Sequence, residues 1–60
     1  MAYYRLYFVQ RGHFVRFEEI EAEDDSAAIA QARRRVGPLS LELWCGRRRV
    51  TSIEAAVVGN

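Results

Sequence analysis

The sequence predicts an α+β protein, a ββαββ two-layer sandwich in which one helix covers one face of a four-stranded, mostly antiparallel sheet. Two aromatic and β-branched runs flank a short turn early in the chain, and an alanine-rich stretch with helix-capping signals follows them. Two further runs then flank a second turn. We expect a single domain over residues 1–60, because 60 residues are too few to build two cores.

The first two strands are expected at about residues 3–10 and 13–22. Both are rich in Tyr, Phe, Val and Ile, which are enriched in strands. Arg11-Gly12 can form a two-residue turn, because glycine takes positive φ without steric cost. Counting outward from the turn pairs Phe8 with Val15 and Leu6 with Phe17 on the helix side, and Val9 with Phe14, Tyr7 with Arg16, Arg5 with Glu18 and Tyr3 with Ile20 on the other side.

The helix is expected at about residues 25–36. Asp24 or Asp25 can cap its first turn, and the acids at its start and arginines at its end complement the helix dipole. Gly37 suits a left-handed position after the helix, and Pro38 cannot continue it. The residues that share one face at helical spacing are Ile29, Ala32 and Val36, with Ala28 beside them.

The third and fourth strands are expected at about residues 39–45 and 48–55. The first of these runs alternates strictly between apolar and polar residues, and a Gly-Arg pair can turn the chain between the two. Ile53 breaks the alternation that Val50 sets. We therefore expect a bulge, or the end of strand pairing, near Ser52.

The directions of the chain restrict the order of the strands. The helix returns the chain from the end of the second strand, so the second and third strands point the same way. The order 2-1-3-4, numbered along the chain, then makes every neighbouring pair antiparallel. The order 1-2-3-4 would contain one parallel pair and is the alternative. A right-handed crossover places the helix on one face.

Residue types that carry chemistry are scarce. The chain has one Cys and one His, so it cannot form an internal disulfide. It has neither metal-ligand spacing nor a glycine-rich phosphate loop. His13 and Cys45 are expected at opposite ends of the helix, beyond hydrogen-bond reach of each other. We therefore expect no enzymatic activity, no cofactor and no metal site.

The composition and the first residues bear on the cellular setting. No apolar run approaches the roughly 20 residues that span a bilayer, and the net charge is only +1. The first residues have neither the apolar region nor the cleavage site of a signal peptide. We expect a cytoplasmic protein without membrane contact.

The sheet face away from the helix is the main functional candidate. Aromatic and apolar side chains are interleaved there with arginines, and one helix covers only one side of a sheet. Exposed patches of this kind usually mark interfaces, so we expect a homodimer or a protein partner. Alternatively, the same mixture can stack nucleic-acid bases. The residues expected on this face are Tyr3, Arg5, Tyr7, Val9, Phe14, Arg16, Ile20, Trp44 and Arg49.

A second candidate surface is basic. All nine basic residues are arginines, whose planar guanidinium suits phosphate. The end of the helix is expected beside the first turn, where a few phosphate contacts could form. The arginines of the second turn are expected near the acids at the start of the helix, which neutralise them in part. The residues of the expected basic patch are Arg11, Arg33, Arg34 and Arg35.

Three stretches carry a resemblance to a known class of proteins, namely Tyr4–Phe8, Asp24–Ile29 and Glu42–Val50. In these the chain resembles short bacterial proteins that open with a Tyr-rich strand and close with a Leu-Trp-x-Gly-x-Arg-x-Val hairpin. No activity is established for that class, so the resemblance implies a fold and no catalytic residue. The chain is also similar to the small arm-binding domains of phage integrases, which have three strands rather than four.

Overall fold

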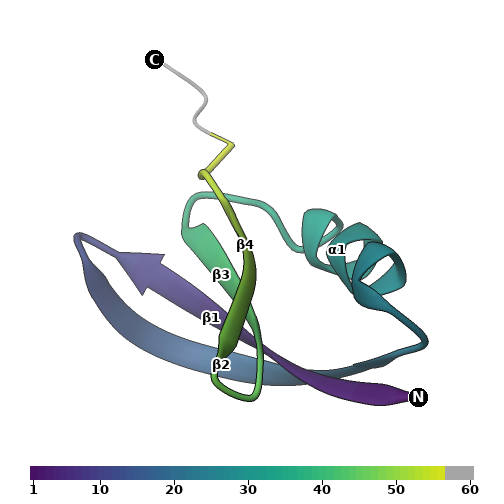
Figure 1. Cartoon of the computed structure of the whole chain (residues 1–60). Helices are drawn as coiled ribbons and strands as arrows, with labels where there is room; N and C mark the ends of the chain where they lie inside the picture. Colours follow the sequence, from purple (N-terminus) through teal and green to yellow (C-terminus); the bar gives the residue numbers. More distant parts are fainter. Residues whose placement is uncertain (57–60) are drawn as a thin grey trace.

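The chain forms strands β1 (Ala2–Gln10) and β2 (His13–Ala22), helix α1 (Asp25–Arg33), and strands β3 (Ser40–Cys45) and β4 (Arg48–Ile53) (Figure 1). The computed structural model describes residues 1–56. The four strands form one sheet in the order β2-β1-β3-β4, and each neighbouring pair is antiparallel. The predicted ββαββ fold and strand order are confirmed. The fourth strand ends two residues earlier than expected, and residues 57–60 lie outside the described part.

The turn of the first hairpin has the backbone that its sequence predicts. Arg11 and Gly12 both take positive φ, 53° and 80°. Positive φ at both central residues defines a type I′ turn, whose twist matches that of the flanking strands. In the second turn only Gly46 has positive φ, 61°, as the first position of a type II′ turn requires.

A β-bulge interrupts the first hairpin close to this turn. Val9 pairs with Phe14, but Phe8 pairs with Arg16, so Val15 has no partner on β1. One extra residue exchanges the two faces of the strand beyond it, because side chains alternate with a period of two. The expected pairs next to the turn are therefore correct, and those beyond the bulge were wrong by one residue.

The bulge changes the position of three important side chains. Ile20, expected away from the helix, is buried in the core and pairs with Tyr4. Arg16, expected on that same outer face, pairs with Phe8, and its guanidinium carbon lies 3.7 Å from the centre of that ring. Phe17, expected in the core, lies on the outer face instead.

A second bulge lies in the other hairpin. The pairing shifts by one residue between Leu43 and Trp44, which leaves Val50 without a partner on β3. The bulge expected near Ser52 therefore exists but lies two residues earlier. Because of it, Val50 and Ile53 both pack against the core, which explains the broken alternation in the sequence.

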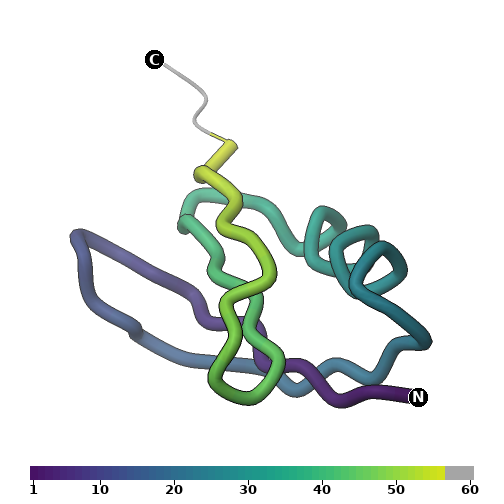
Figure 2. The backbone as a smooth tube through the Cα atoms, in the orientation of Figure 1, coloured from purple at the N-terminus to yellow at the C-terminus, as the bar shows by residue number. Residues whose placement is uncertain are grey.

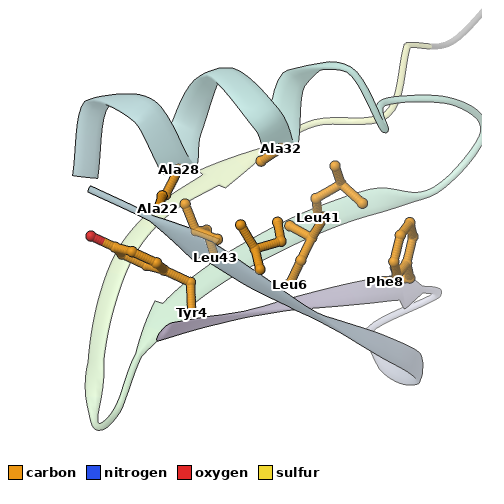
Figure 3. Packing of buried hydrophobic residues seen from close by; sticks show 9 residues of the cluster. Tyr4, Leu6, Phe8, Ala22, Ala28, Ala32, Leu41 and Leu43 are labelled. Atoms are coloured by element: carbon orange, nitrogen blue, oxygen red, sulfur yellow. The ribbon is translucent and has the colours of Figure 1, made fainter. Parts of the chain in front are cut away.

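The core lies between α1 and one face of the sheet (Figure 3). Ala28 and Ala32 are fully buried on the helix side, and their small size lets the helix backbone approach the sheet closely. Leu6, Leu41 and Leu43 meet them from the sheet and are equally buried. The other buried apolar residues are Tyr4, Phe8, Ile20 and Ala22.

The helix begins where the sequence predicts it, but it ends earlier than expected. Asp24 is the N-cap residue, and its Oδ1 accepts a hydrogen bond of 2.8 Å from the amide of Ala27. The helix ends at Arg33, three residues earlier than expected. The amides of the next three residues bond carbonyls three positions back, which tightens the last turn into 3₁₀ geometry. Gly37 does not take the expected left-handed conformation.

Polar contacts fix the helix on the sheet along its length. At its start, the carboxylate of Asp25 accepts hydrogen bonds from two strands. In its middle, Nε2 of Gln31 donates to the carbonyl of Glu21 at 3.0 Å. After its last turn, the guanidinium of Arg35 donates to the carboxylate of Glu18. The helix therefore has a defined position, although its fully buried residues, Ala28 and Ala32, are small and the larger Ile29 is only partly buried against the core.

The positive φ of Arg11 generates a stability prediction. Left-handed backbone costs most L-residues roughly 1–2 kcal/mol, and asparagine tolerates it better. Arg11→Asn should therefore raise the free energy of unfolding by about 0.5–1 kcal/mol, as measured by urea denaturation. Arg47→Asn is the control, because it also removes one turn arginine but at a position without positive φ. A loss of stability in Arg11→Asn alone would contradict the turn geometry.

Candidate functional site

The face of the sheet opposite α1, here called the open face, is covered by no element within residues 1–56 (Figures 1 and 2). Strand alternation and the observed register assign its residues. They are Tyr3, Arg5, Tyr7 and Val9 of β1, Phe14, Phe17, Glu19 and Glu21 of β2, Ser40, Glu42 and Trp44 of β3, and Arg49 and Ser52 of β4.

Seven of the nine residues expected on this face lie there, and two lie on the helix side. The two are Arg16 and Ile20, which the bulge in β2 moves. Phe17 takes their place on the open face and was missed for the same reason. A signal for it exists in the sequence, because Ile20 and Ala22 are apolar at a spacing of two just before the helix. Residues in that pattern face the helix side, which places Phe17 on the other.

Aromatic rings form a continuous row on the open face. Tyr7 stacks on Phe14 with ring centres 4.6 Å apart and planes inclined by 20°. Tyr7 also lies 5.8 Å from the ring centre of Phe17, with the two planes inclined by 46°. The guanidinium carbon of Arg5 lies 4.6 Å from the centre of the Phe17 ring. Phe14 and Phe17 remain 54% and 49% exposed. The row therefore presents a large apolar area to water.

The charged groups of the open face are balanced. A carboxylate oxygen of Glu19 lies 3.8 Å from the guanidinium of Arg5. Glu42 accepts a 3.0 Å hydrogen bond from the indole nitrogen of Trp44, and its other oxygen lies 4.0 Å from the guanidinium of Arg49. Each arginine of the face thus has a carboxylate of its own chain beside it, which weakens its attraction for phosphate.

A surface hollow lies at the end of the aromatic row, near the start of β1. Its volume is about 490 Å³, and Tyr3, Arg5, Tyr7 and Glu19 of the open face line it together with Tyr4 and Gly46. Phenol, guanidinium and carboxylate groups all border this hollow. It can therefore accept a protruding side chain that carries both an apolar and a polar group.

On the helix side, one polar cluster links three elements. The phenol of Tyr4 donates a 2.8 Å hydrogen bond to Oδ1 of Asp25. The guanidinium of Arg48 donates to both oxygens of the same carboxylate, at 2.9 and 3.1 Å. The cluster joins β1, α1 and β4, and it confirms that an arginine of the second turn pairs with an acid at the start of the helix.

The hydrogen bonds of this cluster also shift its pKa values. The bonds from Arg48 and then Tyr4 hold the pKa of Asp25 below its usual value. The hydrogen bond to Asp25, followed by burial, raises the pKa of Tyr4 to about 12. Because all its charges are paired and Tyr4 is only 4% exposed, the cluster serves the fold rather than a ligand.

The residues of the expected basic patch are not gathered at one place. Arg35 donates to Glu18, which also accepts a 3.1 Å bond from Arg16. Arg11 lies at the tip of the first hairpin, and Figure 1 shows that tip well apart from the helix. Arg33 and Arg34, at the end of the helix, are exposed.

His13 and Cys45 lie at different levels of the sheet. His13 pairs with Gln10 at one end of β1, whereas Cys45 follows Trp44, which pairs with Arg5. At about 3.4 Å per residue these levels are roughly 20 Å apart. Within residues 1–56, no group of three or more His, Cys, Asp or Glu side chains is arranged to hold a metal ion. In the same residues, no helix has the length and apolar character to cross a membrane.

Comparisons of the chain with models of protein families, with curated protein sequences and with solved structures each gave no match.

The Tyr4–Asp25 hydrogen bond generates a prediction for alkaline pH. Tyr4 has a folded pKa of about 12 against an ordinary value of 10.0, so its contribution to stability is complete below pH 10. That contribution is lost as the pH rises toward 12, because the unfolded phenol ionises first. Denaturant unfolding between pH 8 and pH 12 should show this loss, and Tyr4→Phe should abolish it.

Tyr3→Phe is the matched control, because Tyr3 is 73% exposed. It should retain the alkaline loss of stability. The absorbance of the phenolate should agree, with the ionisation step near pH 12 missing in Tyr4→Phe and present in Tyr3→Phe. If both variants retained that step, the Tyr4–Asp25 bond would not exist in solution.

Proposed function

We propose that the protein is a non-enzymatic interaction module that buries its open face against protein, either a second copy or a partner chain. The contiguous aromatic rings of Phe14, Tyr7 and Phe17 carry this proposal. Soluble monomers rarely leave contiguous apolar patches of this kind in water. Aromatic residues with arginine are also the residue types that dominate binding energy at protein interfaces.

The charge balance of the open face supports a protein partner over nucleic acid. Binding to nucleic acid depends on arginines and lysines that neutralise phosphates. On the open face Arg5 and Arg49 lie beside Glu19 and Glu42, and Glu21 adds a further negative charge. A surface with both signs of charge around an apolar centre is typical of a protein interface.

Two further expectations stay proposals. The lone Cys45 supports a reducing, cytoplasmic setting, where free thiols persist. The Leu43-Trp44 hairpin supports the resemblance to short bacterial proteins, and that class offers no activity to transfer.

The proposed interface generates a prediction for Phe17. Wild-type protein should show a concentration-dependent mass above the 6.9 kDa of the monomer in size-exclusion chromatography with light scattering. Phe17→Ser removes the ring that Tyr7 and Arg5 contact, and it should abolish this increase. Phe17→Tyr keeps the ring and should preserve it. Thermal unfolding of both variants checks that the fold is intact.

Unchanged association in a folded Phe17→Ser protein would show that the open face is not the interface. A wild-type protein that stays monomeric up to hundreds of micromolar would instead exclude the second copy as the partner.

Nucleic acid is the second candidate, favoured by the stacked rings with Arg5 beside them. Fluorescence polarisation of a labelled single-stranded oligonucleotide at about 50 and 200 mM salt tests it, because phosphate contacts weaken steeply with salt. A nucleic-acid module should bind at the lower salt and lose affinity at the higher one, and Arg5→Gln should weaken binding further. Lack of binding at the lower salt would remove this candidate.

A further inference from the structure

The strand pairing arranges the residues of the open face into cross-strand rows, which run across all four strands and differ from the aromatic row described above. Arg5 pairs with both Glu19 and Trp44, and Trp44 pairs with Arg49. The first row, from β2 to β4, therefore reads Glu19, Arg5, Trp44 and Arg49. One step further along the strands, the second row reads Phe17, Tyr7, Glu42 and Ser52.

When the first row is laid over the same row of a second copy in the opposite order, complementary groups meet. The acidic end of the row, Glu19, meets its basic end, Arg49, and the guanidinium of Arg5 meets the indole of Trp44. We propose, building on the function proposed above, that the open face binds a second copy of this chain across a two-fold axis that runs parallel to the strands, between β1 and β3. This axis lays β2 of one copy over β4 of the other and keeps the rows aligned.

Three of the four pairs that these two rows create bring complementary groups together, and the fourth places Phe17 over Ser52. Glu19 faces Arg49 of the second copy, and Arg5 faces the indole of its Trp44, where a cation–π contact can form. In the second row, the phenol of Tyr7 faces the carboxylate of Glu42. Each contact occurs twice, because a two-fold interface uses the same patch on both copies.

Two other two-fold arrangements do not pair the charges. With an axis perpendicular to the strands and between the two rows, Glu19 lies over Phe17 and Arg49 lies over Ser52. With an axis perpendicular to the strands and on the first row, Glu19 lies over Glu19 and Arg5 lies over Arg5. Of these three axes, the parallel one gives both Glu19 and Arg49 an opposite charge.

The geometry of packed sheets tolerates this pairing. Two sheets pack face to face about 10 Å apart with strands crossing at about 30°. An edge strand lies roughly 7 Å from the axis, so that crossing displaces it by about 4 Å. The side chains of Glu19 and Arg49 are long enough to span such a displacement, and neither is held by a close intramolecular bond, since their nearest ion pairs are 3.8 and 4.0 Å long.

The area of the open face bears on whether two copies can form a specific complex. Four strands about 4.8 Å apart and about seven residues long have a flat footprint of roughly 450 Å². Side chains raise the accessible area above that footprint, so two copies bury on the order of 1,000–1,200 Å², the lower end for specific complexes. An interface of this size is therefore large enough for a specific dimer.

The test uses two single charge reversals, Glu19→Arg and Arg49→Glu. Alone, each creates two like-charge contacts in the dimer, and the dissociation constant should rise at least about tenfold. Mixed in equal amounts, the two variants restore opposite charges at both contacts. The mixture should therefore form a heterodimer with nearly wild-type affinity, as measured by sedimentation equilibrium at about 0.15 M salt, where charges are screened beyond roughly 8 Å.

Glu23→Arg is the matched control. It makes the same charge reversal as Glu19→Arg, but in the exposed link between β2 and α1, and it should leave the dissociation constant unchanged. Thermal unfolding of each variant separates loss of fold from loss of contact.

Each outcome decides the proposal. Weak association of both variants alone and recovery on mixing support it. No recovery on mixing, while wild-type association still depends on Phe17, overturns this axis and leaves the proposed function standing. Monomeric wild-type protein at hundreds of micromolar overturns the second copy as occupant.

Discussion

The carboxylate of Asp25 joins three elements that share little apolar area. The helix contributes only Ala28 and Ala32 to the buried core, so the area it covers is small and its position depends on directed contacts. Tyr4 and Arg48 both donate to Asp25, which fixes the first turn of the helix against β1 and the start of β4. Because the alanines bring the helix close to the sheet, the leucines of β1 and β3 are covered although the helix has nine residues.

One short helix covers one face of the sheet, and this explains why the open face carries exposed aromatic side chains. The described part of the chain has a single helix, so the aromatic side chains of the open face pack against one another rather than against a second layer. Tyr7 contacts both Phe14 and Phe17, and Arg5 lies over the ring of Phe17. Such stacking removes part of the apolar surface from water and leaves the upper side of the rings free for contact. The paired charges around them keep the surface soluble without making it strongly basic.

The sequence predicts those features that depend on local chemistry. Arg11-Gly12 sets the first turn, Asp24 or Asp25 can cap the helix, and chain direction favours the observed order of the strands over the order 1-2-3-4. Counting outward from the turn does not give the register beyond Val15, because a bulge depends on the balance of packing over the whole strand. Phe17 and Ile20 are both apolar, and only the spacing of Ile20 and Ala22 before the helix indicates that Ile20 is the buried one. The bulge also explains why the carboxylate beside Arg5 is Glu19 rather than the expected Glu18. Glu42 lies on the open face by regular alternation with Trp44, so its place beside Arg49 does not depend on that bulge.

The bulge in β2 has a consequence for how this surface can change. The unpaired residue beside the turn sets which side chains beyond it face the open side. Losing Val15 would turn the bulge into regular pairing with Phe8 still opposite Arg16, so Phe17 would stay on the open face and Ile20 in the core. The exterior beyond the bulge therefore tolerates this change in length. Substitutions in the same strand alter that exterior one position at a time.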